Sequence, residues 1–325
     1  MKVLITGGAG FIGSHLCEKL LAQGHNVTTI DDLSTGSHTN IAHLEANENF
    51  QLVVDTVLDS HLMNQLIRDC DMIYHLASAV GVQLIIDEPT KTIQTIVEGT
   101  RVVLDAARRY RRPVLITSTS EVYGKGSKIP FSEDDDVVLG PTSTRRWLYA
   151  SAKMLDEFLA LAHWYETKLP VIIVRLFNTV GPRQIGQYGM VVPRFVQKAL
   201  AGEPLTIYGD GQQARCFCHV SDATNAIIRL MDQPQSYGKV INVGSEEEIT
   251  ILNLAKTVID MTQSKSQITY LTYEQAYTQG FEDMLRRVPD LTRVKELIDH
   301  QPDYDLKGVI QSTIDYWSNQ QHTSP

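Results

Sequence analysis

Short apolar runs alternate with amphipathic stretches through the first half of the chain. The runs are rich in β-branched residues and have the length of strands, whereas apolar positions in the stretches recur at helical spacing. Strand–helix alternation predicts parallel strands with right-handed crossovers, and apolar strands predict a sheet covered on both faces. The strand candidates are Val3–Ile5, Val27–Ile30, Gln51–Val54, Met72–Tyr74, Val114–Ile116 and Val171–Val174, and the helix candidates are His15–Gln23, His61–Arg68 and Thr95–Arg109.

The pattern changes after Asn178, where glycine and proline become frequent. Such residues favour loops, so we expect residues 1–178 to form one domain and residues 179–325 a smaller α/β domain. The apolar run at 240–243 predicts a strand that returns to the first domain's sheet. The polar tail 319–325 predicts a frayed end.

Composition excludes several classes of protein. The 325 residues are 43% hydrophobic and 21% charged, and the net charge of -9 argues against a nucleic-acid partner. Apolar runs stay well short of the roughly 20 residues that cross a bilayer, and the amino terminus does not resemble a signal peptide. Four cysteines in a chain this long do not make a disulfide scaffold, which indicates reduced thiols, no metal site and a cytoplasmic location.

A glycine-rich turn follows the first strand directly. Gly7 permits a tight turn, Gly10 lets the backbone approach a pyrophosphate, and Gly13 lets helix and strand pack closely. The helix that this turn opens presents free N–H groups and its positive dipole end to the phosphates, and Phe11 and Ile12 are candidates for cofactor contact. We therefore expect a Rossmann-type doubly wound sheet that binds a dinucleotide.

Further residues refine the cofactor site. Asp31 ends the second strand, where a carboxylate would bond the adenosine ribose and repel a 2′-phosphate, so NAD is favoured over NADP. Asp55 follows the third strand and is a candidate for the adenine. Small residues after the fourth strand would let the backbone pass close to the cofactor, and these are Leu76, Ala77 and Ser78.

Groups that move protons follow the fifth strand. Thr119 lies at its carboxyl end, and Tyr149 and Lys153 lie one turn apart on a predicted helix, so they share a face. An ammonium group and a positive nicotinamide ring would both favour tyrosinate. Tyr149 would then take a proton from a sugar hydroxyl while hydride leaves for the cofactor, and Lys153 would also hold the cofactor ribose.

Together these features resemble the extended short-chain dehydrogenase/reductase family, the NAD-dependent nucleotide-sugar epimerases, dehydratases and decarboxylases. The resemblance runs from Met1 to about Leu297. Its markers are Gly7-x-x-Gly10-x-x-Gly13, Asp31, His75-Leu76-Ala77, Ser118-Thr119-Ser120-Glu121-Val122-Tyr123-Gly124, Tyr149-x-x-x-Lys153, Arg175-Leu176-Phe177-Asn178, Gly181-Pro182-Arg183 and Tyr208-Gly209-Asp210-Gly211.

The resemblance implies oxidation of a sugar 4-hydroxyl, next to Thr119 and Tyr149, by a tightly bound NAD. It also implies that the second domain binds a UDP-sugar. Asn178 would contact the diphosphate, and Arg215 and Arg287 would neutralise phosphates. Base and nucleoside would lie against Val192, Pro193, Thr206 and Tyr208. Helices starting near Ile93 and Tyr149 would form a homodimer through a helical bundle.

The fate of the 4-keto sugar depends on Ser120 and Glu121. Dehydratases of the family carry Asp then Glu here, and Ser-Glu is similar to UDP-glucuronate decarboxylases, as is the segment Arg146-Trp147-x-Tyr149. Ser120 or Glu121, acting through water, would protonate C5 after carbon dioxide leaves. Our best interpretation is decarboxylation of UDP-glucuronate to UDP-xylose.

Alternatives stay open. Ile96 stands where the family usually has asparagine, and the loop 78–87 looks more like that of epimerases, so a UDP-hexose or UDP-glucuronate 4-epimerase is the second interpretation. A 4,6-dehydratase is the third interpretation. A binding module without catalysis is the last alternative, because a fold does not determine a function. Damage to Thr119, Tyr149 or Lys153 would favour it, and all three residues are intact.

Overall fold

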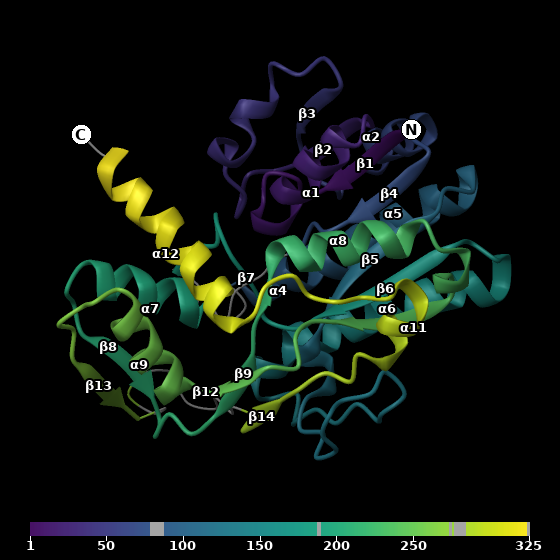
Figure 1. The fold of residues 1–325 in the computed structure, drawn as a ribbon. Coiled ribbons are helices and arrows are strands. Elements are labelled where there is room, and N and C mark those ends of the chain that lie inside the picture. The colour runs from purple at the N-terminus through teal and green to yellow at the C-terminus, as the bar shows by residue number, and fades with distance from the viewer. Residues whose placement is uncertain (79–87, 187–189, 273–274, 276–283, 324–325) are drawn as a thin grey trace.

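A seven-stranded parallel sheet forms the centre of the computed structural model, which describes residues 1–78, 88–186, 190–272, 275 and 284–323. All six neighbouring pairs in the sheet are parallel. This strand order, with flanking helices, confirms the α/β doubly wound fold (Figure 1). The order is β11 (Lys239–Val243), β6 (Val171–Leu176), β5 (Val114–Thr119), β4 (Met72–His75), β1 (Lys2–Thr6), β2 (Asn26–Asp31) and β3 (Phe50–Val54).

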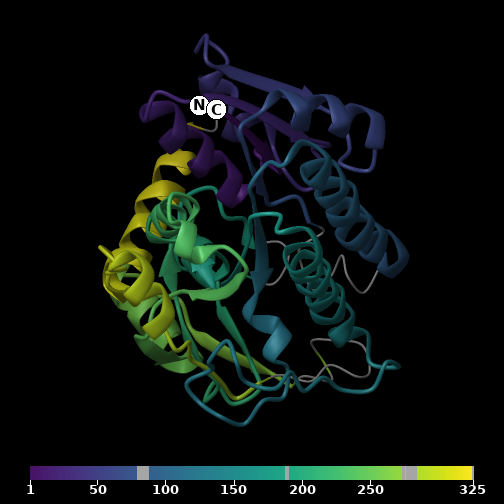
Figure 2. The ribbon, with the colours of Figure 1, turned by 90° about the vertical axis from the view of Figure 1, so that its right-hand side faces the viewer.

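Helices cover both faces of the sheet because successive strand residues point to opposite sides. In β1, Val3 and Ile5 pack with one set of helices and Leu4 with the other. The first set is α1 (Phe11–Ala22), α8 (Val220–Met231) and α11 (Thr292–Ile298); the second is α2 (Ser60–Asp69), α5 (Gly99–Tyr110) and α6 (Leu148–Thr167). α5 and α6 run side by side (Figure 2).

Two predicted helices have different bounds in the structure. α1 begins at Phe11, before the predicted His15, because the glycine turn leads straight into the helix. The stretch predicted at 95–109 is α5 preceded by α4 (Pro89–Ile93) and by a π-helical turn, η3 (Gln94–Glu98). The short 3₁₀ turns are η1 (His38–Asn40), η2 (Ala42–Leu44), η4 (Ser120–Tyr123), η5 (Arg145–Trp147) and η7 (Pro234–Ser236).

A second, smaller lobe has its own core, formed around Phe195, Ile207 and Leu254. Its helices and strands are α7 (Val191–Leu200), α9 (Ile251–Met261), the pair β8 (Leu205–Tyr208) with β13 (Ile268–Leu271), and the sheet β12 (Glu248–Thr250), β9 (Ala214–Cys216), β14 (Arg286–Arg287). α12 (Leu306–Thr323) packs on α7 and remains helical through residues 319–323, where the sequence predicted a frayed tail (Figure 1). Its apolar side Val309-Ile310-Ile314 is buried in this core, and that burial holds the helix.

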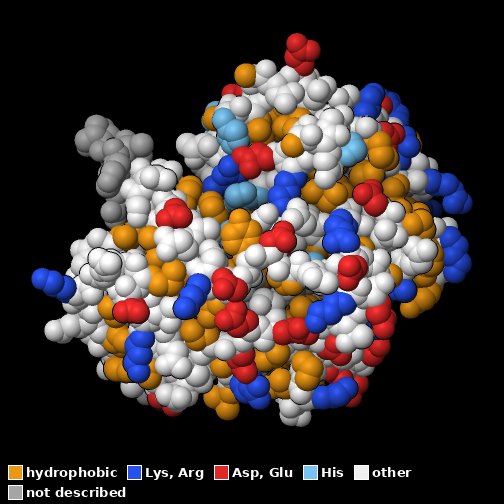
Figure 3. Space-filling model, viewed as in Figure 1, with side chains coloured by type: hydrophobic (Ala, Val, Ile, Leu, Met, Phe, Trp, Pro, Cys, Tyr) orange, Lys and Arg blue, Asp and Glu red, His pale blue; other side chains and the backbone are white. Residues whose placement is uncertain are grey.

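The second half of the chain contributes to both lobes. The run at 240–243 is part of β11, which pairs with β6, and α8 and α11 cover the large sheet. A short parallel pair, β7 (Thr179–Val180) with β10 (Cys218–His219), lies where the chain passes between lobes. Figure 3 shows acidic and basic side chains interspersed on one face of the molecule.

Candidate active site

The glycine turn lies where the carboxyl ends of β1 and β4 meet. Gly7 has a φ of +77°, and a Cβ there would be 2.9 Å from the Ala77 amide nitrogen. A Cβ on Gly13 would be 2.1 Å from the Gly7 carbonyl oxygen. Gly10 is the N-cap of α1 and provides no side-chain hydrogen bond, and Phe11 and Ile12 follow half-buried. This turn therefore needs glycine and leaves the first-turn amides of α1 for a ligand, as a pyrophosphate requires.

Asp31 is held beside this turn at the end of β2. Its carboxylate accepts hydrogen bonds of 2.9 Å from the Ala9 and Leu33 amides, and only 8% of the residue is exposed. Burial raises the pKa of Asp31, and the two amides oppose the rise. Asp55, after β3, is exposed and accepts a bond from the Thr56 amide. Asp31 is thus fixed in place, with lone pairs left for a ribose hydroxyl.

Polar side chains link β1 to α5 beneath this edge. The Thr6 hydroxyl accepts from the Ala77 amide at 3.1 Å and lies 2.7 Å from Nδ1 of His75. Nε2 of His75 lies 3.1 Å from the Thr100 hydroxyl. Burial lowers the pKa of His75 to about 3, so its imidazole is neutral near pH 7. Leu76, Ala77 and Ser78 follow, partly exposed, at the rim of the glycine turn.

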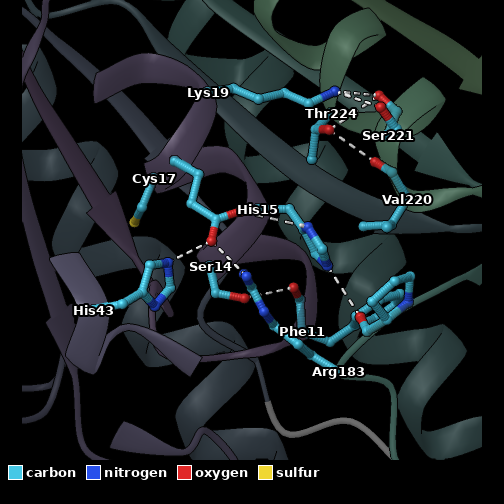
Figure 4. Close-up of polar contacts among 12 residues, drawn as sticks. Phe11, Ser14, His15, Cys17, Lys19, His43, Arg183, Val220, Ser221 and Thr224 are labelled. Carbon is cyan, nitrogen blue, oxygen red and sulfur yellow. Dashed lines mark hydrogen bonds and ion pairs between the residues drawn. The ribbon is translucent and has the colours of Figure 1, made fainter. Parts of the chain in front are cut away.

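The segment after β7 is bonded to α1 (Figure 4). Nε2 of His15 lies 3.0 Å from the Pro182 carbonyl oxygen. The Glu18 carboxylate contacts the guanidinium of Arg183 and lies 2.6 Å from Nε2 of His43. These contacts join the cofactor-side helix to the segment that leads into the second lobe.

Thr119 and Tyr149 lie near each other. Thr119 ends β5, and its hydroxyl accepts from the Glu121 amide at 3.2 Å. Burial raises the pKa of Tyr149 above its ordinary value of 10, and the Glu121 carboxylate adds to the rise. The nearby hydroxyls of Ser78 and Thr119 oppose that rise in the pKa. The phenol therefore keeps its proton until a positive ligand arrives.

Lys153 lies one turn after Tyr149 on α6. Its ammonium donates to Oδ2 of Asp156 at 2.8 Å, and the two side chains are 3% and 0% exposed. The next residue, Glu157, binds Arg175 of β6 with both oxygens, at 3.0 and 2.7 Å. The Tyr149-x-x-x-Lys153 motif did not indicate Asp156 as the partner of Lys153.

Glu121 lies between two arginines. Arg287 donates to Oε1 at 2.6 Å and Arg146 contacts Oε2, with all three side chains 18% exposed or less. Burial would raise the pKa of Glu121, but Arg287 and Arg146 outweigh it and lower it to about 2. Arg287 also donates to the Ser120 hydroxyl at 3.3 Å. The carboxylate is therefore ionised at any ordinary pH.

Arg287 and Arg215 are neighbours in the β14–β9 pair. Burial lowers the pKa of Arg287, and the charges of Arg215 and Arg146 add to that effect while Glu121 opposes it. We expected Arg287 near a phosphate, and the structure places it on Glu121 and Ser120; a phosphate contact stays a prediction. The sequence indicated Arg146 only as part of the Arg146-Trp147-x-Tyr149 segment. Its contact with Glu121 was found in the structure.

The other residues expected to bind the nucleotide lie in or near the second lobe. The Asn178 amide donates to the Cys216 carbonyl at 2.8 Å. The side chains of Val192 and Pro193 are buried in the first turn of α7, so they pack inward. Thr206 and Tyr208, on β8, are partly exposed. Sequence reasoning missed Arg194, whose guanidinium lies 4.5 Å from the centre of the Tyr208 ring.

Some expectations concern other features. The four cysteines are buried and free. Within the described ranges, no group of three or more His, Cys, Asp or Glu could hold a metal ion, and no helix is long and apolar enough to cross a membrane. Ile96 is buried in η3. Beyond Ser78, the loop 78–87 lies outside the described residues.

Comparisons with known proteins agree with this geometry. A family model described as GDP-mannose 4,6 dehydratase matches residues 4–313. A UDP-N-acetyl-alpha-D-glucosaminuronate decarboxylase from Bacillus cytotoxicus is 43% identical, with 97% of each chain covered. UDP-glucuronic acid decarboxylase 1 from Danio rerio is 37% identical, over 98% of this chain and 73% of the relative. The UDP-glucuronic acid 4-epimerase from Bacillus cereus, solved with UDP-glucuronic acid and NAD, has a TM-score of 0.89 and 27% identity, covering 98% and 100%.

Proposed function

Because the chain belongs to the GDP-mannose 4,6-dehydratase family, we propose that it uses NAD to oxidise C4 of a UDP-linked uronic acid and then decarboxylates the ketone. UDP-glucuronate, converted to UDP-xylose, is the substrate that we place first. When bound, NAD accepts hydride from C4 and returns it after carbon dioxide has left. Two relatives that act as decarboxylases support this outcome.

The glycine turn and Asp31 support NAD as the cofactor. The turn tolerates no side chain at Gly7 or Gly13, which suits a pyrophosphate against the backbone. The buried Asp31 carboxylate would accept a bond from the adenosine ribose and would repel a 2′-phosphate. We assign Phe11, Ile12, Gly10, Leu76, Ala77 and Ser78 to the walls around the cofactor and Asp55 to its adenine end.

Tyr149 and Thr119 would act on the sugar 4-hydroxyl. Tyr149, deprotonated beside the positive nicotinamide ring, takes the hydroxyl proton as hydride leaves C4. Thr119 orients that hydroxyl from the end of β5, and Lys153 holds the cofactor ribose. The same tyrosine returns its proton to the C4 oxygen when the ketone is reduced.

One observation carries the choice of a uronate: two buried arginines surround Glu121 beside the catalytic segment. Arg146 and Arg287 bring two positive charges and Glu121 one negative charge, so the cluster favours an additional anion. A sugar carboxylate is such an anion, and guanidinium groups bind carboxylates with good geometry. A neutral hexose has no carboxylate to interact with the net positive charge of this cluster.

Decarboxylation follows from the position of the ketone. With C4 oxidised, the C5–C6 bond breaks, its electron pair forms the enolate, and C5 then takes a proton. Glu121, with a pKa lowered to about 2, is a poor proton donor at neutral pH. We therefore assign Glu121 to holding the arginines and Ser120, which Arg287 contacts, to the proton transfer at C5 through water.

Ionised Glu121 also disfavours a dehydratase, which needs an acid to expel water. A 4-epimerase needs only rotation of the ketone and hydride return, and the structural similarity to UDP-glucuronic acid 4-epimerase keeps it as the second candidate. Both reactions share the first oxidation, so only the product separates them.

The substituent at C2 of the sugar is a separate choice. The relative at 43% identity acts on a uronate with an acetamido group, and the relative at 37% acts on UDP-glucuronate. We therefore regard the acetamido sugar as the substrate to compare directly with UDP-glucuronate. Nucleotide contacts are assigned to Asn178, Thr206, Tyr208, Arg215 and the segment of Val192 and Pro193.

An exposed apolar stripe on α6 supports a homodimer through a helical bundle. Leu155, Phe158 and Tyr165 are 45%, 63% and 65% exposed and recur at helical spacing with the exposed Ala162. An apolar face of this kind commonly packs against a partner. Ile93, 44% exposed on α4, lies in an element that contacts α6 and extends the proposed interface. We also propose a cytoplasmic location, which the free cysteines fit.

A product assay tests the function. Purified protein is incubated with UDP-glucuronate or with its 2-acetamido counterpart, and products are identified by mass spectrometry and chromatography. Loss of one carbon dioxide supports decarboxylation, loss of one water a dehydratase, and unchanged mass with altered retention an epimerase. If neither sugar changes and neither reduces bound NAD, the uronate proposal fails.

A further inference from the structure

Asp156 lies on the same face of α6 as the two relay residues. Tyr149, Lys153 and Asp156 are spaced by four and then three residues, so their side chains line one side of the helix. The ammonium of Lys153 is 2.8 Å from Oδ2 of Asp156, and both side chains are at least nine-tenths buried. We propose that Asp156 is a positioning residue that anchors Lys153 for the relay, an inference that rests on the function proposed for Tyr149 and Lys153.

The pair is costly to bury, which argues against an incidental contact. Removing two charges from water costs several kcal/mol per ion, and their attraction returns it only in good geometry. Oδ1 of Asp156 has no hydrogen-bond partner among the described residues, so Lys153 is the cation that justifies placing this carboxylate here. In return, the carboxylate selects one placement of a long and flexible side chain.

The neighbouring segment explains why the partner comes from α6 itself. η3 packs against α6, and its buried residue is Ile96, which offers no hydrogen bond. Similar proteins usually carry asparagine at this position. The polar contact of Lys153 comes instead from α6 itself, through the Asp156 carboxylate one turn after the lysine.

The anchor also affects the charge near Tyr149. Asp156 compensates the charge of Lys153, and its carboxylate contributes to the raised pKa of Tyr149. Burial raises the pKa of Asp156 itself, and Lys153 opposes that rise. Lys153 would therefore act mainly as a placed hydrogen-bond donor, and tyrosinate would form only beside the positive cofactor.

Other charged groups packed around the relay are already paired. Glu121 of η4 lies between Arg146 of η5 and Arg287 of β14. Glu157 of α6 is bound by Arg175 of β6. His75 of β4, which lies near Lys153, is neutral because burial lowers its pKa. Changing Asp156 thus alters the charge at Tyr149 while these partners stay in place.

Thermal unfolding of the protein without substrate tests the anchor. Lys153→Met leaves the Asp156 carboxylate buried without its cation and should lower the midpoint clearly. The double variant Lys153→Met/Asp156→Asn removes that charge and should recover much of the loss, as coupled neighbours do. If the two substitutions act additively, the side chains are not coupled and the proposal is overturned.

The pH dependence of NAD reduction by substrate tests the relay. Asp156→Asn keeps the side-chain shape and an oxygen for Lys153 but removes the charge, so the pH profile should move lower by on the order of one unit. Asp156→Ala also removes the anchor and should slow reduction by on the order of tenfold to a hundredfold. Asp105→Asn, which breaks an exposed ion pair on α5, is the matched control and should leave the profile unchanged.

A profile for Asp156→Asn that superimposes on that of the unmodified protein overturns the inference, because a purely structural carboxylate would not shift it. Binding of NADH, followed by its fluorescence, needs no substrate and should weaken in Asp156→Ala relative to Asp156→Asn. If no uronate reduces NAD but this binding and the unfolding cycle behave as expected, the proposed substrate fails and the anchor stands. If uronates turn over and all three readouts are unchanged, the anchor fails alone.

Discussion

At the scale of single residues, Glu121 has the surroundings that most restrict the chemistry. A buried carboxylate alone would hold its proton more tightly, yet two guanidinium groups make it one of the stronger acids in the protein. Its environment suits charge balance better than proton transfer. The neighbouring Ser120, bonded by the same Arg287, is the group to which we assign the proton transfer at C5.

Glu121→Gln should destabilise the protein by about 3–5 kcal/mol, because Arg146 and Arg287 would lose their buried partner. The pKa of Glu121 falls from 4.5 to about 2 on folding, so its contribution is complete above about pH 4.5 and is lost as the pH falls toward about 2. Urea unfolding at several pH values should therefore show a gap between the two proteins at pH 7 that narrows below pH 4.5. A gap independent of pH would contradict the ion-pair origin.

Tyr149→Phe should reduce the rate of NAD reduction by about a hundredfold to ten-thousandfold, because the 4-hydroxyl loses its proton acceptor. Stopped-flow absorbance of the bound cofactor measures this step. The variant should still bind NAD and the UDP-sugar, since the phenol ring is kept. Near-normal reduction would remove Tyr149 from the relay.

At the scale of elements, the turn between β1 and α1 decides where the cofactor lies. Contacts of this turn with Ala77 and with its own Gly7 carbonyl leave no space for side chains. α1 is also bonded through His15 and Glu18 to the segment after β7, as Figure 4 shows. In the proposed function, one helix would thus hold the phosphates and contact the segment that leads into the second lobe.

Gly13→Ala should abolish copurification of NAD and cost about 1–3 kcal/mol, because the new methyl group would press on the Gly7 carbonyl. Cofactor content by absorbance and the unfolding midpoint are the measurements. Gly308→Ala on α12 is the matched control, since its Cβ meets only side-chain atoms, and it should change stability by less than about 1 kcal/mol. Full NAD content in Gly13→Ala would argue against a phosphate site at this turn.

At the scale of the whole molecule, the two lobes bring together groups far apart in sequence. Arg287 of the small sheet β12–β9–β14 reaches Glu121 after β5, and Asn178 after β6 reaches Cys216 of β9. The site therefore forms only when both lobes are folded and docked. The exposed stripe of α6 lies on the helix that carries the relay, so a dimer would brace that helix.

Phe158→Glu should convert the proposed homodimer to a monomer by placing a charge in the apolar stripe. Light scattering after gel filtration measures the mass. Leu58→Glu, at an exposed leucine outside α6, is the control and should keep the dimer. A Phe158→Glu protein that stays dimeric would place the interface elsewhere.

Much of the fold could be predicted because its signals are local. The runs that became β1 to β6 are apolar over their own length, and the glycine spacing reports a turn within a few residues. The start of α1 at Phe11 was missed because it depends on the glycine turn. The π-helical turn at the start of the stretch predicted at 95–109 was missed because it depends on packing against α6. The helix α12 was not predicted because its amphipathic sequence is stabilised as a helix by burial against α7.

The sequence by itself determined the doubly wound sheet and the glycine turn with Asp31, since each depends on neighbouring residues and on the end of a strand. It also placed Tyr149 and Lys153 one turn apart on a helix. Only the tertiary structure decided that Arg146 and Arg287 enclose Glu121 and that Asp156 takes the ammonium of Lys153. These charge pairs form because the charged groups are buried. In low dielectric a charge must have a counter-charge within reach, and which one it has depends on how separate segments pack.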